Sequence, residues 1–144
     1  MDMNIEFARK TALAYNMTCK SLCQELGLPQ TAFDILMFLA NNPDYRTASD
    51  IVEIRKLKAN LVSINVDKLV RDGYLKRCAV EEDRRKTELI CTEKAQPIIA
   101  RGRKLQQTFV TRILTGIDEE AQKKFAETVS IMEKNLDQIL KGEA

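Results

Sequence analysis

Apolar residues recur every three or four positions in three long stretches, which is the period of a helix with one buried face. One stretch covers residues 4–26, and the other two lie within residues 94–141. Their apolar positions are Ile5, Ala8, Ala12, Tyr15, Cys19, Leu22 and Leu26, then Ala95, Ile98, Gly102, Leu105, Phe109 and Ile113, then Phe125, Val129, Met132, Leu136 and Ile139. The first stripe alone fits packing within one subunit as well as packing against a second chain. Because all three flank a complete small fold, we expect residues 4–26 and 94–141 to form an intertwined dimer interface.

The middle of the chain, residues 30–93, is predicted to contain shorter elements. Thr31 is positioned to cap one helix, and Thr47 is positioned to cap a second over residues 48–55. Their apolar positions are Phe33, Leu36, Met37 and Ala40 in the first helix, and Ala48, Ile51 and Val52 in the second. A third helix is predicted over residues 58–72, which completes a helix-turn-helix pattern.

The helix predicted over residues 58–72 has one apolar and one polar face. Val62, Val66, Leu69 and Val70 form the apolar face, and Asn60, Ser63, Ile64, Asp67, Lys68 and Arg71 face away from it. Two β-prone runs follow at residues 74–80 and 87–92, with a charged loop at 81–86 between them, and Thr92 is positioned to cap the next helix. This order predicts a mainly α fold with a small β-hairpin, a winged helix-turn-helix suited to lie on duplex DNA.

Charge is unevenly distributed along the 144 residues, although the net charge is only +2. Residues 55–86 contain ten Lys or Arg and five Asp or Glu, so this segment has a net charge of +5 and the remainder has −3. A run of charges can be no more than a solvated face. Its coincidence with the helix-turn-helix pattern favours electrostatic binding to DNA phosphates.

The outward side of the helix over residues 58–72 contains the candidate DNA contacts. Lys58, Asn60 and Ser63 lie near its start and can reach phosphates or base edges, and Lys68 lies further along. Ile64 lies opposite the buried stripe, where it would fit a thymine methyl group; the alternatives are a contact with the hairpin or a plain surface position. Asp67 would repel phosphate, so we expect it to pair with a nearby Lys or Arg.

The loop over residues 81–86 is the candidate wing tip. It is too long for a two-residue turn, and we expect an ion pair between Asp83 and Arg85 to order it. Arg84 or Arg85 would then enter a minor groove, because narrow A·T tracts attract arginine. The other basic residues of the tip, including Lys86, would lie on phosphates.

The four cysteines are Cys19, Cys23, Cys78 and Cys91, and the chain has no histidine. Cys19 and Cys23 are four positions apart on the first helix, so they lie near each other. Because no pair has the Cys-x-x-Cys spacing of a zinc or redox motif, we expect no metal and no cofactor. The thiols are either small buried apolar groups or, at Cys19 and Cys23, sensors of oxidation, because a thiolate in a basic setting is reactive.

Several classes of protein are disfavoured by the sequence. A chain without histidine and without a glycine-rich phosphate loop offers no catalytic arrangement, so we do not expect an enzyme. No apolar run approaches the roughly 18 residues of a membrane span, and residues 1–4 do not resemble the start of a signal peptide. A single domain over residues 1–144, located in the cytoplasm without a membrane partner, is the expectation.

Two segments resemble the MarR family of bacterial transcriptional regulators. Residues 66–75 resemble the end of that family's recognition helix and its glycine turn into the wing. Residues 83–95, Asp-Arg-Arg-Lys-Thr-Glu-Leu-Ile-Cys-Thr-Glu-Lys-Ala, resemble its wing tip and the segment that follows. The sequence departs from the family pattern at Ala95, often a glycine, at Cys91, usually a leucine, and at Ile64, often polar or basic.

The resemblance implies a homodimer on a pseudo-palindromic operator in double-stranded DNA. Helices starting at Lys58 would enter two major-groove segments, and the two wings would reach the flanking minor grooves. It also implies control by a small ligand or by thiol oxidation, usually relieving repression. A ligand would lie between the lobe of residues 30–93 and the dimerisation helices, near Tyr15, Cys19 and Phe33. The alternative from another class is a winged-helix module that binds only proteins.

Overall fold

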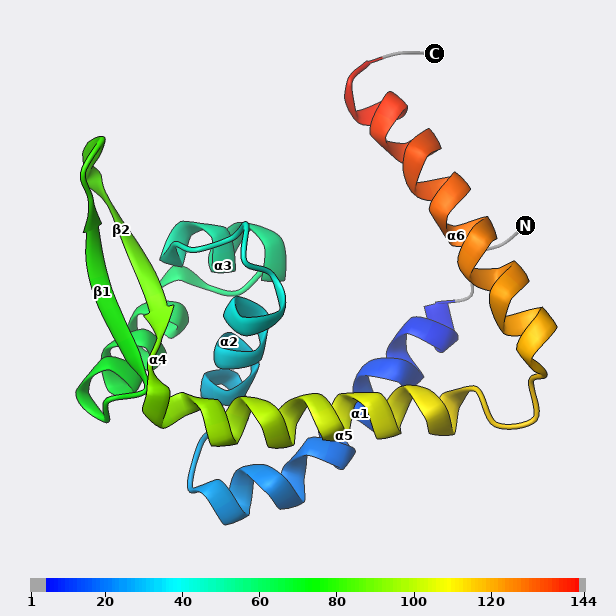
Figure 1. Ribbon diagram of the computed structural model, residues 1–144, viewed down its shortest axis with the longest axis horizontal. Helices are drawn as coiled ribbons and strands as arrows, with labels where there is room; N and C mark the ends of the chain where they lie inside the picture. The colour runs from blue at the N-terminus through cyan, green and yellow to red at the C-terminus, as the bar shows by residue number, and fades with distance from the viewer. Residues whose placement is uncertain (1–4, 143–144) are drawn as a thin grey trace. The chain divides into compact units, whose positions relative to one another are not determined.

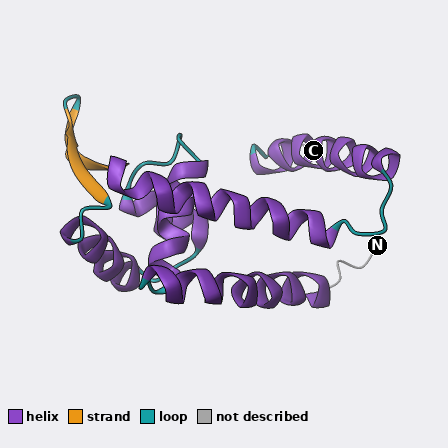
Figure 2. Cartoon of the chain, turned by 60° about the horizontal axis from the view of Figure 1, so that its bottom comes forward, coloured by secondary structure: helices purple, strands orange, loops and turns teal. Residues whose placement is uncertain are grey.

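Helices make up most of the described chain, and a two-stranded antiparallel sheet interrupts them (Figure 1). The structure, a computed structural model, describes residues 5–142. Its contacts divide the chain into two units, residues 1–107 and residues 108–144. Within residues 5–142, no helix combines the length and the apolar character needed to cross a membrane. The predicted mainly helical fold with a small hairpin is confirmed (Figure 2).

The predicted elements are present with small changes at their ends. The first unit contains α1 (Ile5–Leu26), α2 (Gln30–Asn41), α3 (Ala48–Arg55), α4 (Ala59–Arg71), β1 (Leu75–Val80), β2 (Asp83–Cys91), the 3₁₀ helix η1 (Glu93–Ala95) and most of α5 (Gln96–Ile113). The second unit contains the end of α5 and all of α6 (Glu119–Leu140). The helices predicted over 4–26, 48–55 and 58–72 therefore exist, and Asn4 and the rest of residues 1–4 lie outside the described part.

Helix α2 forms the centre of the first unit's core. Phe33, Leu36 and Met37 are buried as predicted, and so are Ala32, Ile35, Phe38 and Leu39, so the helix is covered on nearly every side. The predicted cap at Thr31 is wrong. Pro29 occupies the N-cap position with an extended backbone and no side-chain cap, and Gln30 is already helical.

Helices α3 and α4 form the helix-turn-helix. Thr47 caps α3 as predicted: its hydroxyl accepts a hydrogen bond from the Asp50 amide at 3.1 Å, and the Asp50 carboxylate accepts one from the Thr47 amide at 3.1 Å. Ala48, expected in the core, is exposed, whereas Ile51 is fully buried. Lys56 ends α3 with φ 54°, the left-handed conformation that glycine usually supplies in such a turn.

The hairpin differs from the prediction at its tip. β2 begins at Asp83, which pairs with Val80, so only residues 81–82 form the turn and the predicted six-residue loop is wrong. The next pair is Ala79 with Thr87, so the register shifts there and Arg84, Arg85 and Lys86 are extra residues on β2. The sequence showed only a run of charges, which does not distinguish an irregular strand from a loop.

Hydrogen bonds fix the base of the hairpin. The Thr92 hydroxyl donates to the Gly73 carbonyl at 2.6 Å, so its predicted role as the cap of the next helix is wrong. The Lys94 ammonium donates to the Asp72 carbonyl at 2.6 Å and lies 4.6 Å from the centre of the Tyr74 ring. Gly73 has φ 84°, which favours glycine at this turn from α4 into β1.

Helix α5 packs closely on α2 at Gly102. A Cβ atom at this position would lie 2.4 Å from the Met37 sulfur and 3.1 Å from a Phe33 ring carbon, so only glycine fits without movement of the core. Polar contacts continue along the same helix. The Gln106 amide donates to the Tyr15 hydroxyl of α1 at 2.9 Å, and the Asn41 amide of α2 donates to the Gln106 carbonyl oxygen at 3.0 Å.

The second unit is dominated by α6, which contains no buried residue. The Asp118 carboxylate accepts a hydrogen bond from the Ala121 amide at 2.8 Å and caps the helix. The apolar stripe of α6 is uncovered within the single chain: Phe125 is 65% exposed and Leu136 is 54% exposed.

Candidate nucleic-acid interface

Helix α4 presents the predicted face to solvent. Lys58, at its N-cap, and Asn60, Ser63 and Ile64 are exposed, whereas Lys68 is half-buried. The opposite side packs into the core through Val62, Val66 and Leu69. The carbonyl oxygen of the Asn60 side chain accepts a hydrogen bond from the Leu61 amide at 2.9 Å. Its two amide N–H groups make no hydrogen bond within the described residues, so they are available to a base edge.

Ile64 is the most exposed large apolar side chain of α4, with 64% of its surface accessible. Its predicted position opposite the buried stripe agrees with this exposure. An isoleucine here offers a base pair only apolar contact, and in the major groove the thymine methyl group is the apolar feature that distinguishes one base pair from another.

Asp67 pairs with Arg77 of β1, so the expected partner of this carboxylate exists. The ion pair joins α4 to the hairpin and neutralises the one acidic group on the outward face of α4. Sequence reasoning counted Arg77 only as part of the positive charge. Strand alternation alone could not show which residue of α4 the arginine meets.

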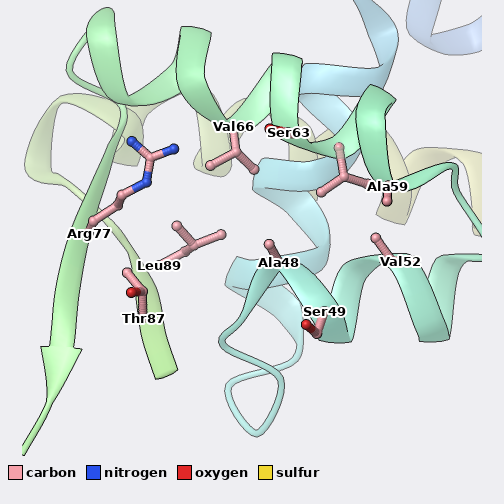
Figure 3. Close-up of a pocket in the computed structure, with 10 residues that line it drawn as sticks. Ala48, Ser49, Val52, Ala59, Ser63, Val66, Arg77, Thr87 and Leu89 are labelled. Atoms are coloured by element: carbon pink, nitrogen blue, oxygen red, sulfur yellow. The ribbon is translucent and has the colours of Figure 1, made fainter. Parts of the chain in front are cut away.

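An open groove of about 350 Å³ lies between α3, α4 and the hairpin (Figure 3). Its apolar wall includes Val52, Val66 and Leu89. Its polar groups are the hydroxyls of Ser49, Ser63 and Thr87 and the guanidinium of Arg77. Ser49 and Thr87 were not among the predicted contacts, because they come from elements that the sequence does not show to converge.

The basic residues of the wing tip are exposed. Arg84, Arg85 and Lys86 are all accessible, as contacts with phosphates or a minor groove require. The expected ion pair between Asp83 and Arg85 takes a different form: the Asp83 carboxylate accepts a hydrogen bond from the Arg85 backbone amide at 3.0 Å. Asp83 therefore holds the backbone of the tip and leaves the Arg85 guanidinium available.

The hairpin is also attached to the loop between α2 and α3. The Leu89 amide of β2 donates to the Arg46 carbonyl at 2.7 Å, and the guanidinium of Arg46 lies 3.9 Å from the Glu88 carboxylate. Burial opposes ionisation of Asp50, but hydrogen bonds from the Thr47 and Arg46 amides, together with the charge of Lys86, hold the pKa of this carboxyl below its usual value. The positions of α3 and the wing are therefore linked.

The candidate effector and redox residues lie in the core of the first unit. Cys19 and Phe33 have no exposed surface, and Tyr15 is partly buried against them. Burial raises the pKa of the Cys19 thiol, although a hydrogen bond with Tyr15 opposes this, and burial raises the pKa of Cys23 to about 11. Both thiols are therefore protonated near neutral pH, which is the opposite of what fast oxidation requires.

Nearby, burial raises the pKa of the Asp34 carboxyl to about 6, against the opposing charge of Arg55. Burial also raises the pKa of the Tyr15 hydroxyl. Among residues 5–142, no group of three or more His, Cys, Asp or Glu is arranged to hold a metal ion. The sequence predictions for Tyr15, Cys19, Cys23 and Phe33 stay predictions.

Comparison with known proteins supports the resemblance to the MarR family. Residues 26–86, from the end of α1 to the wing tip, match the model of the MarR family. The solved structure of transcriptional regulator PA3341 is similar over 92% of this chain and 97% of that one, with 26% identity and a TM-score of 0.75. Residues 26–86 of this chain are therefore similar to the MarR family, and the described fold matches the MarR winged-helix fold.

Other solved structures have the same MarR fold. A putative MarR family regulator from Listeria monocytogenes, complexed with a 26mer DNA, is 17% identical and has a TM-score of 0.78 over 100% of this chain and 98% of that one. A MarR transcriptional regulator from Methanosarcina mazei Go1 is 21% identical and has a TM-score of 0.71 over 93% and 99% of the two chains. No curated protein matches the sequence.

Proposed function

We propose that this protein is a regulator of the MarR family and a homodimeric repressor that binds a pseudo-palindromic operator in double-stranded DNA. The observation that carries the proposal is the outward face of α4, where Asn60, Ser63 and Ile64 are exposed. The wing tip adds three exposed basic side chains, Arg84, Arg85 and Lys86. The solved structure of a similar fold in complex with a 26mer DNA supports it. Two α4 helices related by a two-fold axis would meet half-sites about 10 base pairs apart.

The uncovered apolar faces support a dimer. Phe125, Met132 and Leu136 on α6, and Ile5 and Phe7 at the start of α1, are exposed in the single chain. Soluble proteins rarely leave such stripes uncovered, and a second copy with the same two faces could cover them symmetrically. Leu136→Lys should shift the protein toward the monomer in sedimentation equilibrium, whereas the neighbouring polar change Asn135→Lys should leave it dimeric.

Selection of bound sequences from a random duplex pool tests the proposal. The expected result is an inverted repeat with half-site centres about one helical turn apart. The affinity of the selected duplex should fall steeply as salt rises, because each neutralised phosphate releases counterions. A pool without enrichment would refute the proposal and favour the alternative of a module that binds only proteins.

Release of the operator by a small ligand is the favoured form of control. The buried, protonated thiols of Cys19 and Cys23 weigh against direct control by oxidation. Mass spectrometry after mild peroxide treatment should find both thiols unmodified, and the affinity for the operator should be unchanged. Oxidation at Cys19 or Cys23 with loss of binding would reverse this preference. A regulator of this kind acts in the cytoplasm, where we expect this protein.

A further inference from the structure

An acid–base pair lies beside the groove between α3, α4 and the hairpin. Arg77 lines this groove and reaches from β1 toward α4 (Figure 3). Its guanidinium pairs with the Asp67 carboxylate, and the side chains of Arg77 and Asp67 are 45% and 53% exposed. An exposed ion pair contributes little to the stability of a protein. Stability therefore does not account for an acidic side chain on the outward face of α4.

Three hydroxyl groups line the same groove without a partner. Ser49 of α3, Ser63 of α4 and Thr87 of β2 are exposed, and their hydroxyls make no hydrogen bond within residues 5–142. On α1, by contrast, the hydroxyls of Thr11 and Thr18 each donate to the carbonyl four residues earlier, at 2.7 and 2.8 Å. The groove therefore offers three free hydroxyl donors, from three elements, around one guanidinium.

The position of the groove relative to DNA follows from the proposed function. A winged helix places its recognition helix in the major groove, and the wing tip is proposed to enter the adjacent minor groove. One sugar–phosphate strand separates these two grooves of a duplex, so this strand must cross between α4 and the hairpin. Hydroxyl and guanidinium groups are the donors that proteins commonly direct at phosphate oxygens. The donors of the groove therefore lie where a backbone phosphate would pass.

We propose that a phosphate of the bound strand takes Arg77 away from Asp67, and that Asp67 thereby restrains binding to every duplex. Arg77 and the three hydroxyls form the phosphate site. The proposal rests on the proposed function, because it assigns a role within the same DNA-binding surface. Asp67 competes for the arginine and repels the phosphate, and each effect weakens binding. A phosphate contact carries no sequence information, so the restraint lowers specific and nonspecific affinity together.

An ion pair with a merely structural role predicts the opposite sign. If the pair only held the hairpin against α4, loss of either member would loosen the wing and weaken binding to DNA. If the carboxylate restrains the arginine, its loss strengthens binding. The hairpin keeps other attachments in both cases: the Leu89 amide donates to the Arg46 carbonyl at 2.7 Å, and the Thr92 hydroxyl donates to the Gly73 carbonyl at 2.6 Å. Variants of the pair should therefore fold.

Equilibrium binding of the selected duplex, and of a scrambled duplex of the same length, tests the sign. We expect Asp67→Asn to bind both duplexes at least about threefold more tightly, with a gain that shrinks as salt rises. Asp67→Glu keeps the charge and should bind like the unmodified protein. Glu53→Gln is the matched control, because Glu53 is an exposed acid on α3 that neither lines the groove nor makes an ion pair within the described residues. It should leave both affinities within about twofold of the unmodified protein.

Replacement of the arginine tests the other member of the pair. Arg77→Gln should weaken binding to both duplexes by at least about fivefold and reduce the salt slope by about 1. Lys76→Gln, on the opposite side of the same strand and outside the groove, is the control and should change binding by less than about twofold. In the Asp67→Asn background, Arg77→Gln should lose more affinity than in the unmodified protein, because the phosphate there has no carboxylate to displace. An ion pair that only held the hairpin would give a smaller loss in that background.

Methylphosphonate substitution locates the phosphate. Each phosphate of the selected duplex is replaced in turn with an uncharged methylphosphonate. One replacement in each half-site, on the strand between the major-groove and minor-groove segments, should weaken binding of the unmodified protein by at least about fivefold. The same replacement should weaken binding of Arg77→Gln by less than about twofold, because that variant has already lost the contact.

The proposal is overturned if Asp67→Asn binds both duplexes as the unmodified protein does, or more weakly. It is also overturned if every methylphosphonate effect persists in Arg77→Gln. The proposed function would survive either result, because the unmodified protein would still select an inverted repeat. Failure of the unmodified protein to bind any duplex would instead refute the proposed function itself.

Discussion

Replacing Gly102 with alanine tests the close packing of α5 on α2. The added methyl group would lie 2.4 Å from the sulfur and 2.9 Å from the terminal carbon of Met37. Met37 is only 2% exposed, so its side chain cannot simply move into solvent. The core must therefore shift, or the methionine must adopt a less favourable rotamer.

Two opposing effects set the magnitude. Overpacking a well-filled core costs about 1–3 kcal/mol, whereas alanine in place of glycine inside a helix stabilises by about 1 kcal/mol. We therefore expect Gly102→Ala to lower the free energy of unfolding by about 0–2 kcal/mol. In the Met37→Ala background the clash with the methionine is absent, so the same change should raise it by up to about 1 kcal/mol.

Urea denaturation of the unmodified protein, the two single variants and the double variant measures this change of sign. All four are compared at one protein concentration, because the stability of the proposed dimer depends on concentration. Ala100→Gly, at an exposed position of α5, is a control that measures the effect of helix propensity without a core contact. It should lower the free energy of unfolding by about 1 kcal/mol. If Gly102→Ala stabilises both backgrounds equally, the two helices do not approach as closely as the structure shows, and the reasoning fails.

Four further predictions test other parts of the molecule. The pKa of Asp34 is raised to about 6 in the folded protein, so the contribution of this group to stability should be greatest below about pH 4 and should be lost as the pH rises through 6. Asp34→Asn should remove that loss and stabilise by about 1–2 kcal/mol at pH 7 in urea titrations, after allowance for partial exposure; equal pH profiles would contradict this. Arg84→Ala with Arg85→Ala should weaken binding to all duplexes alike and reduce the salt slope by about 2, and normal binding would refute the wing assignment. Asn60→Ala should relax sequence preference in a repeated selection. Replacing one operator thymine with uracil should weaken binding by roughly fourfold, because one buried methyl group is worth about 0.8 kcal/mol. Binding by the Ile64→Ala variant should not change with the same replacement. If uracil has no effect at any thymine, Ile64 does not read a thymine methyl group.

Periodicity predicted the helices well. The stripe of Val62, Val66 and Leu69 located both the buried and the outward face of α4, because burial of one face sets the 3.6-residue repeat. Residue type at a helix start predicted the Thr47 cap, whose partner Asp50 lies three residues away in the sequence. Local signals sufficed wherever the competing interactions were also local.

The Thr31 cap failed for a local reason, because Pro29 starts the helix earlier, but other failures have causes that the local sequence does not show. Thr92 was expected to cap a helix, but its hydroxyl bonds to Gly73, nineteen residues earlier, which only the folded hairpin brings near. The tip over residues 81–86 was predicted as a loop because its charges hide the irregular pairing that continues to Asp83. The groove between α3, α4 and the hairpin could not be predicted, because its walls come from separate elements that only the fold brings together.

The hydrogen bonds at the root of the hairpin fix one end of it more firmly than the other. Thr92 and Lys94 lock the root to the turn between α4 and β1, next to the first turn of α5, and the Leu89 amide joins the middle of the hairpin to Arg46. Within the described residues, no hydrogen bond joins residues 81–86 to an element outside the hairpin. A six-residue strand spans about 20 Å, so a tilt of roughly 10° at the root displaces the far end by about 3–4 Å. That displacement exceeds the length of a hydrogen bond, so a tilt of the root would be enough to lift an arginine out of a groove.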